Sequence, residues 1–203
     1  MRDKYGELLP YVNCKDDLNY IIGELIGELN VGHAYINGGD KFKPERIKLG
    51  LLGAKLEKDK SGYYKINKIL KGENFRKELR SPLTEVGMDI NEGDFIVAVN
   101  GESTKDMNDI YESLVNTAGK EVILSISTSA SESGAKDVIV VPIADESKLY
   151  YYNWVQENIR KVNEATDGQV GYIHIPDMGP DGLNEFAKYF YPQLDKKALI
   201  IDD

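Results

Sequence analysis

The sequence has little of what disulfide-bonded, metal-binding or membrane proteins need. Its 203 residues contain one cysteine, Cys14, and two histidines, His33 and His174. A single cysteine cannot form a disulfide within the chain, and a zinc site would have to be built from these three residues. No apolar run approaches the ~20 residues that span a bilayer. We therefore expect no disulfide, no metal or other cofactor, and no membrane partner.

Positive charge is scarce as well. The chain has 34 acidic and 25 basic residues, a formal net charge of −9. Such a surface repels phosphate backbones, which argues against a nucleic-acid partner. The N-terminal stretch MRDKYGELLP carries charges where a secretory signal needs an apolar core, so no compartment can be assigned from it. The residues that are plentiful, 41% hydrophobic and 29% charged, are typical of a soluble domain with a buried core.

Apolar periodicity predicts a helix near the N-terminus, over residues 16–30. Asn13 is placed to cap this helix, and Asn30 and Gly32 are placed to end it. A short strand over residues 33–37 should follow, before Gly38-Gly39 turns the chain. One helical face carries the apolar residues Leu18, Ile21, Ile22, Leu25, Ile26 and Leu29.

From Ile47 the pattern changes to short strands separated by turn residues. One helix interrupts them over residues 106–118, where Met107, Ile110, Tyr111, Leu114 and Val115 share a face. This composition predicts a small β-barrel with one flanking helix. The expected strands cover residues 51–57, 63–70, 94–100, 121–127 and 137–142.

The last third of the chain reads as the beginning of an α/β layer. A helix over residues 147–166 precedes a stretch, residues 170–190, that reads as a buried strand, a Pro/Gly turn and a further helix. A second strand follows over residues 198–201. Because a strand–helix–strand crossover is right-handed, the two strands should be parallel.

The segment SPLTEVGMDINEGDFIVAVNGEST, residues 81–104, resembles the central motif of a PDZ domain. The turn-forming residues of this segment suit such a domain. Gly93 permits a positive φ, Asp94 can bond nearby amides, and Asn100-Gly101 is a favoured tight turn. PDZ domains bind an extended peptide beside a strand edge, and amides of a glycine-containing loop receive its terminal carboxylate.

The same resemblance implies a peptide groove, in which Gly50-Leu51-Leu52-Gly53 loosely matches the carboxylate loop. Leu52, Gly53 and Ala54 would then begin the groove strand, while Met107 and Tyr111 would line the opposite helix. The alternative is that these apolar side chains belong to the core.

The stretch GYIHIPDMG, followed by GLNEF, is similar to the tricorn core protease nearly residue for residue. The order of the whole chain is similar too, with a helical segment ending in a histidine, a PDZ domain and an α/β region. The resemblance implies an α+β fold of three parts. These are an N-terminal helical segment over residues 1–45, a PDZ-like barrel over 46–146, and the truncated start of a ClpP/crotonase-like peptidase layer over 147–203.

Tricorn proteases belong with the C-terminal processing peptidases, in which a serine attacks the peptide carbonyl and a histidine acts as its base. The position that matches this histidine is His33, and Gly179 matches the turn glycine whose amide serves the oxyanion. Imidazole chemistry and an amide at a strand-to-helix turn suit these roles. The alternatives are a structural His33 and a Gly179 that only turns the chain. His174 matches no catalytic position.

Two departures limit the resemblance. Gly32 stands where tricorn has a serine whose hydroxyl helps to orient the catalytic histidine, so another group must hold the imidazole. The family's Asn-Gly-Gly-Gly segment, its nucleophilic serine and the glutamate of its tetrad should all follow LIIDD, the end of this sequence.

We therefore predict the N-terminal part of a tricorn-like serine endopeptidase, acting on peptides or unfolded proteins and inactive by itself. A non-catalytic PDZ peptide-binding module is the alternative. An unpaired strand edge in the last third would favour a homo-oligomer. The resemblance implies a cytoplasmic location, or a periplasmic or secreted one if the parent gene has a signal peptide.

Overall fold

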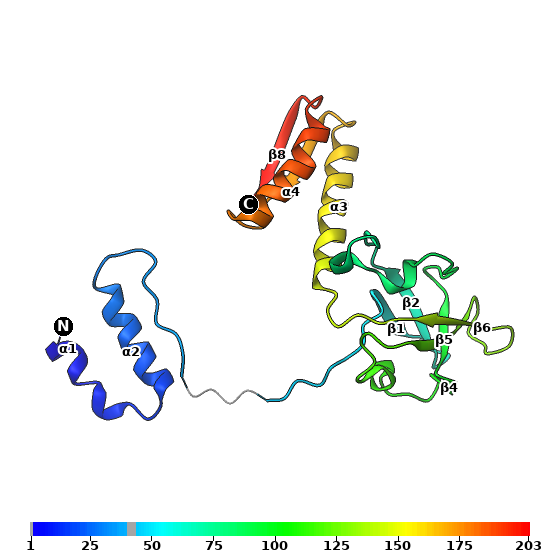
Figure 1. The fold of residues 1–203 in the computed structure, drawn as a ribbon, viewed down its shortest axis with the longest axis horizontal. Helices are drawn as coiled ribbons and strands as arrows, with labels where there is room; N and C mark the ends of the chain where they lie inside the picture. Colours follow the sequence, from blue (N-terminus) through cyan, green and yellow to red (C-terminus); the bar gives the residue numbers. More distant parts are fainter. Residues whose placement is uncertain (1, 40–43) are drawn as a thin grey trace. The chain divides into compact units, whose positions relative to one another are not determined.

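The computed structural model describes residues 2–39 and 44–203. Within these ranges the chain forms two compact units, divided between Arg46 and Ile47, and each is described by itself (Figure 1). In the described ranges, no helix is long and apolar enough to cross a membrane.

The N-terminal unit is a pair of helices held by a buried tyrosine. Helix α1 spans Arg2–Gly6, the 3-10 helix η1 spans Leu9–Tyr11, and helix α2 spans Lys15–Gly27. Tyr5 is the buried residue of α1, and its hydroxyl donates to the carbonyl of Glu24 (3.2 Å) and to the carboxylate of Glu28 (2.9 Å). α2 itself has no fully buried residue, so its apolar face is only half covered.

Two details of this unit differ from the prediction. The cap of α2 is Cys14 rather than Asn13, because the side chain of Asp17 reaches back to the backbone of residue 14 in a capping box. Residues 33–37 form no strand; they run as irregular chain beside α2, where the Asn19 amide donates to the carbonyl of Gly38 (2.6 Å). A strand needs a hydrogen-bonded neighbour, and the described part of this unit contains only helices and turns.

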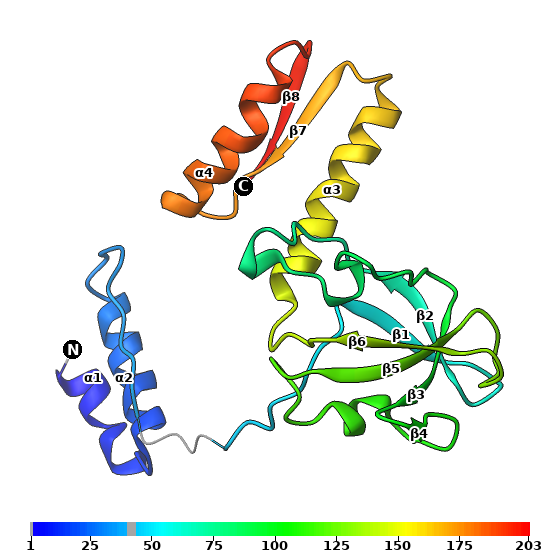
Figure 2. The same ribbon diagram turned by 45° about the vertical axis from the view of Figure 1, so that its right-hand side comes forward.

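The second unit begins with an antiparallel sheet in the order β1-β2-β3-β5-β6, with β4 paired to β3 (Figure 2). The short strand β4 was not expected from the sequence. The predicted Asn100-Gly101 turn is confirmed: both residues have positive φ, as a tight hairpin between β3 and β4 requires. The strands are β1 Ala54–Lys58, β2 Tyr64–Ile69, β3 Phe95–Val99, β4 Glu102–Ser103, β5 Val122–Ser127 and β6 Lys136–Val140.

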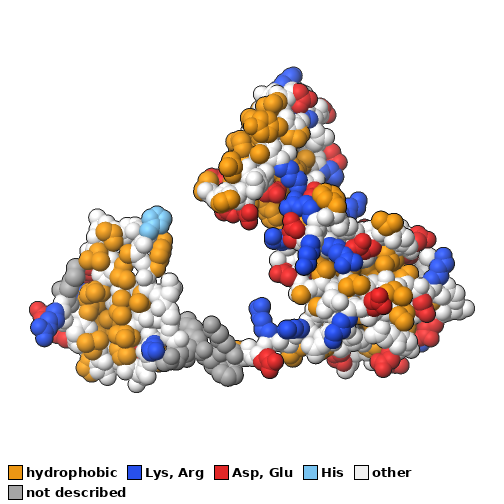
Figure 3. All heavy atoms as spheres, in the orientation of Figure 1, with side chains coloured by type: hydrophobic (Ala, Val, Ile, Leu, Met, Phe, Trp, Pro, Cys, Tyr) orange, Lys and Arg blue, Asp and Glu red, His pale blue; other side chains and the backbone are white. Residues whose placement is uncertain are grey.

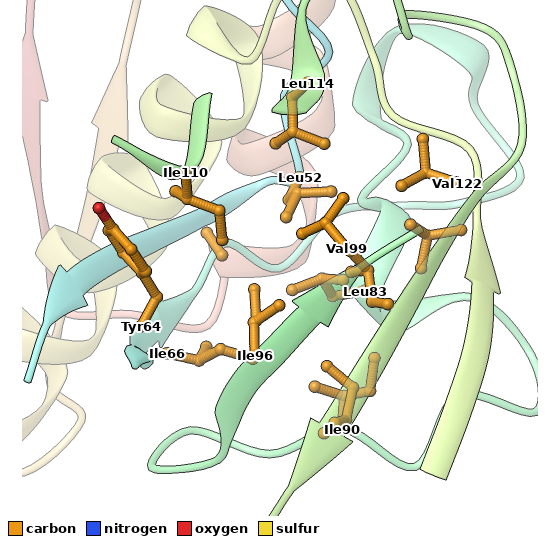
Figure 4. Close-up of a cluster of buried hydrophobic side chains, with 14 of the residues drawn as sticks. Leu52, Tyr64, Ile66, Leu83, Ile90, Ile96, Val99, Ile110, Leu114 and Val122 are labelled. Atoms are coloured by element: carbon orange, nitrogen blue, oxygen red, sulfur yellow. The ribbon is translucent and has the colours of Figure 1, made fainter. Parts of the chain in front are cut away.

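The side chains on the inner face of this sheet form one hydrophobic core (Figure 4). Two short 3-10 helices, η2 Lys77–Leu79 and η3 Pro82–Thr84, lie in the long connection between β2 and β3. Leu83 of η3 is a member of the core, and Leu79 of η2 is buried but is not part of this cluster. Ile66, Ile96, Leu114 and Leu124 have no exposed surface at all. The cluster comprises Leu52, Ala54, Tyr64, Ile66, Ile69, Leu83, Ile90, Ile96, Val99, Ile110, Leu114, Val122, Leu124, Ile126 and Val140.

The flanking helix expected over residues 106–118 is wrong in type and length. The structure has a five-residue 3-10 helix, η4 Ile110–Leu114, capped by the Asp109 carboxylate, which accepts from the amide of Tyr111. The predicted apolar face is confirmed in part: Ile110 and Leu114 enter the core, whereas Val115 is 39% exposed. The helix cannot continue because Val115 pairs with Leu49 as an isolated bridge and the amide of Asn116 donates to Lys48.

The terminal region of this unit confirms the predicted parallel pair. Helix α3 spans Ser147–Ala165, β7 spans Val170–His174, helix α4 spans Pro180–Phe190, and β8 spans Ala198–Asp202 after the 3-10 helix η5 Tyr191–Gln193. β7 and β8 pair in parallel from Val170–Ala198 to His174–Asp202. The two strands, α3 and α4 together form a small α/β layer (Figure 2).

Helices α3 and α4 are fastened to the sheet region by contacts with the loop that follows β2. Asn153 of α3 exchanges two hydrogen bonds with the backbone of Lys71, at 3.1 and 2.8 Å. Lys188 of α4 forms an ion pair with Glu73 (3.2 Å). The loop after β2 thus contacts α3 through Lys71 and α4 through Glu73.

Candidate active-site residues and peptide groove

The predicted general base, His33, lies on the surface of the N-terminal unit. Its backbone has a φ of 60°, a left-handed conformation that non-glycine residues adopt rarely and often at functional positions. The residue is exposed. The predicted base is therefore a surface residue of its unit, in a backbone conformation unusual for histidine.

Tyr35 is the residue that contacts the His33 imidazole. Its hydroxyl lies 3.4 Å from Nδ1, and the two rings meet edge to face with centroids 6.4 Å apart. The sequence left open which group could orient the imidazole in place of a serine at Gly32. Tyr35, two residues along the chain, is the group that the structure offers.

The predicted oxyanion amide, that of Gly179, stands at the start of α4. Gly179 is the N-cap residue of this helix, where backbone amides point toward the positive end of the helix dipole. Its N–H already donates to the Asp177 carboxylate (2.6 Å), and the N–H of Gly182 donates to the same oxygen (3.2 Å). The amides of this turn thus bind a carboxylate, and that carboxylate is the side chain of Asp177 in the same turn.

A cavity of about 300 Å³ opens beside this turn. Its lining includes Pro176 and Asp177 from the turn, Tyr151 from α3 and Arg76 from the loop after β2. Burial raises the pKa of the Tyr151 hydroxyl to about 12, so this group stays protonated and can donate a hydrogen bond at neutral pH. The sequence did not single out this cavity, because its walls come from segments about a hundred residues apart.

His174, which matches no catalytic position of the family, contacts two aromatic side chains. It lies in β7, its Nδ1 is 2.8 Å from the Tyr151 hydroxyl, and its ring packs edge-on against Trp154 with centroids 4.8 Å apart. An imidazole fixed between two aromatic rings serves packing. In the part of the chain that the structure describes, no cluster of His, Cys, Asp or Glu side chains could hold a metal ion.

The predicted groove residues lie around one end of β1. Leu52 and Ala54 are buried in the core, with exposures of 2% and 3%, so their side chains cannot contact a peptide directly. Met107 and Tyr111 are half-buried against the same core. Gly53, between the two buried residues in sequence, has a φ of 67°, a conformation that favours glycine. Of the predicted groove residues, only Met107 and Tyr111 therefore keep side-chain surface outside the core.

The Gly53 amide is not vacant. It donates to the carboxylate of Glu146 (3.1 Å), a residue of the connection between β6 and α3. Glu146 could not be predicted from the sequence, because it belongs to no local motif and its partner lies 93 residues away along the chain. Burial raises the pKa of this carboxyl, against a smaller lowering by the Gly53 hydrogen bond.

Comparisons with known proteins identify first the class of the sheet region. Residues 50–145 match the tricorn protease PDZ domain family. The sheet described above is therefore a PDZ region of the tricorn type.

The chain as a whole is similar to part of the tricorn proteases. It is 36% identical over 200 residues to the tricorn protease homolog of Saccharolobus solfataricus, covering 98% of this chain and 18% of the relative. It is 35% identical over 202 residues to tricorn protease homolog 1 of Streptomyces coelicolor, covering 98% and 19%. A crystal structure of the tricorn protease superposes with a TM-score of 0.79 at 30% identity, covering 99% of this chain and 19% of that one. The chain thus corresponds to a tricorn-like protease segment and spans about a fifth of the length of these relatives.

Proposed function

We propose that this chain is part of a tricorn-like serine peptidase in which His33 is the general base and the Gly179 amide helps to bind the oxyanion. Its substrates would be peptides or unfolded proteins. The observation that carries the proposal is similarity to curated tricorn proteases across 98% of the chain, a span that contains both residues.

His33 would take the proton of a serine hydroxyl at Nε2 and return it to the leaving amine. For that, Nε2 must be unprotonated and Nδ1 must carry the hydrogen. The Tyr35 hydroxyl oxygen, 3.4 Å from Nδ1, can accept that hydrogen and so select the required tautomer. Tyr35 would then be a positioning residue that replaces the hydroxyl missing at Gly32.

Gly179 would supply one amide to the oxyanion, a donor whose loss typically costs about 10²–10³ in kcat. Its N–H would first have to leave the Asp177 carboxylate. That exchange is feasible because Asp177 is exposed and its side chain can rotate away. The N-terminal position on α4 adds the favourable helix dipole to the stabilisation of negative charge.

We propose further that the nucleophilic serine is not among these 203 residues, so the chain alone is inactive. The test is labelling with a fluorophosphonate, which reacts with an activated serine. We expect no label on the 203-residue chain and one labelled serine on a parent protein that continues beyond Asp203. In that parent, His33→Ala should slow labelling by about three orders of magnitude or more.

Two further variants of the parent sharpen the assignment. Tyr35→Phe should slow labelling about tenfold and shift its pH profile, while His174→Gln should leave the rate unchanged. Equal labelling of the parent with and without His33 would remove the base assignment.

A PDZ module without catalysis is the second candidate, favoured by the complete hydrophobic core of the sheet region. The same experiment separates the two. A parent without a fluorophosphonate-reactive serine would leave peptide binding as the function.

A further inference from the structure

The loop expected to receive a peptide carboxylate already holds a carboxylate of this chain. Gly53 closes the Gly50–Gly53 segment, and its N–H donates to Glu146 (3.1 Å). Terminal-carboxylate recognition by PDZ domains depends on amides of this kind. Glu146 therefore stands where the terminal carboxylate of a bound peptide would be received.

The neighbouring side chains show that the start of α3 covers this end of the groove. Leu149, one turn into the helix, is 1% exposed, and a Cβ on Gly53 would lie 3.2 Å from its Cδ1. Lys55 of β1 places its Nζ 5.5 Å from the ring centroid of Tyr150. Residues on the strand side of the groove thus pack directly against α3.

Tyr111, the residue expected on the opposite wall, lies within electrostatic range of the same helix end. The pKa of Tyr111 in η4 is raised, chiefly by burial and then by the negative charge of Glu146 and the nearby Tyr150. The printed contacts with Glu146 and Tyr150 come from the strand side of the groove, through Gly53 and Lys55. A peptide C-terminus could reach the Gly53 amide only by displacing Glu146.

The position of Glu146 is fixed by structure on both sides. Before it, Ile143 and Leu51 exchange two backbone hydrogen bonds, at 2.7 and 2.9 Å. After it, α3 is held by the two bonds between Asn153 and Lys71. Glu146 is consequently delivered to Gly53 by a connection anchored at both ends.

We propose that Glu146 is a built-in ligand of the PDZ carboxylate loop, which closes this region to free peptide C-termini. The proposal rests on the groove assignment made above for residues 52–54, Met107 and Tyr111. It gives the PDZ region a defined partner, the β6–α3 connection of the same chain. A polypeptide could still add to the edge of β1, but recognition of its terminal carboxylate is excluded.

Peptide titrations of the whole chain test this proposal. Two peptides of one sequence with an apolar last residue, one a free acid and one amidated, are compared by fluorescence anisotropy. We expect the wild type to bind both equally. Glu146→Ala should bind the free acid at least tenfold more tightly than the amide, because the Gly53 amide is then available. Glu102→Ala, which removes the same charge at an exposed position in β4, should behave as the wild type.

The Gly53 amide resonance gives a direct second reading. In the wild type this resonance should not move when the free acid is added. In Glu146→Ala it should shift with the free acid and not with the amide.

Glu146→Gln keeps an acceptor oxygen in a side chain of the same size and so guards against misfolding. Its preference for the free acid over the amide should be smaller than that of Glu146→Ala. A tenfold preference for the free acid in the wild type would overturn the proposal. So would its absence in a Glu146→Ala chain whose amide spectrum shows a folded sheet. Neither result depends on the role of His33, which fluorophosphonate labelling tests separately.

Discussion

The PDZ sheet and the N-terminal unit bury their apolar residues to very different extents. The sheet encloses fifteen buried residues in one cluster, whereas α2 has no fully buried residue and the buried hydrophobic residue described in its unit is Tyr5. Exposed apolar side chains are correspondingly common in the N-terminal unit, and α4 shows a similar face (Figure 3). They include Leu9, Tyr20, Leu29 and Val31 in the first case and Leu183, Tyr191 and Leu194 at or just beyond α4 in the second.

The PDZ sheet and the remaining parts of the chain therefore differ in the kind of interaction that stabilises them. Burial of apolar surface contributes about 25 cal/mol per Å², so the PDZ sheet can be stable on its own contacts. The segments that carry His33 and Gly179 depend more on local hydrogen bonds and turns. A catalytic role would therefore use the less buried parts of the molecule.

The largest expected effect comes from truncating matched leucines in the two units. Leu124→Ala in β5 removes a side chain with no exposed surface and should lower the free energy of unfolding of the sheet by about 2–5 kcal/mol. Leu25→Ala in α2 removes a half-exposed side chain and should cost less than about 1 kcal/mol. Denaturant titration followed by NMR resonances of each unit measures both. An effect of Leu25→Ala on the sheet resonances equal to that of Leu124→Ala would contradict the separation.

Substitutions of two glycines, Gly182 and Gly179, test the stability of the turn before α4. A Cβ on Gly182 would lie 1.7 Å from the carbonyl oxygen of Asp177, so Gly182→Ala must rebuild the turn. We expect a loss of about 1–3 kcal/mol in the stability of the α4 region. Gly179→Ala meets only the movable Asp177 side chain at 3.0 Å, has an ordinary φ of −106°, and retains its amide.

The control variant Gly179→Ala should therefore change stability by no more than about 0.5 kcal/mol. Hydrogen exchange of the α4 amides reports both values. If both variants were equally mild, the turn would be too adaptable to hold an oxyanion amide in place.

The same division decides what the sequence could predict. Periodicity located α2, α3 and the sheet strands to within a few residues, and glycine chemistry located the Asn100-Gly101 turn, because these signals are local. Periodicity failed over residues 106–118. There the chain pairs with residues 48 and 49 after Leu114, so only a short 3-10 helix forms instead of the predicted α-helix. It failed over residues 33–37 because no strand lies beside them in the described unit. Glu146 gave no signal, since its partner, Gly53, is decided by the folded chain.

The smallest expected effect tests how far the N-terminal unit depends on surface hydrogen bonds. The Asp17 carboxylate accepts from the backbone amide of Asn13 (2.9 Å) and from that of Cys14 (3.3 Å), and these bonds lower its pKa below the ordinary 3.8. A lowered pKa in the folded state means that the cap stabilises α2 above pH 3.8 and that this contribution is lost as the pH falls through the lower folded value. The amide resonances of residues 13–17 should therefore shift toward unfolded positions below pH 3.8, and Asp17→Asn should remove that titration. The same titration in Asp17→Asn would show that the capping box does not hold the start of α2, and the N-terminal unit would then need another source of stability.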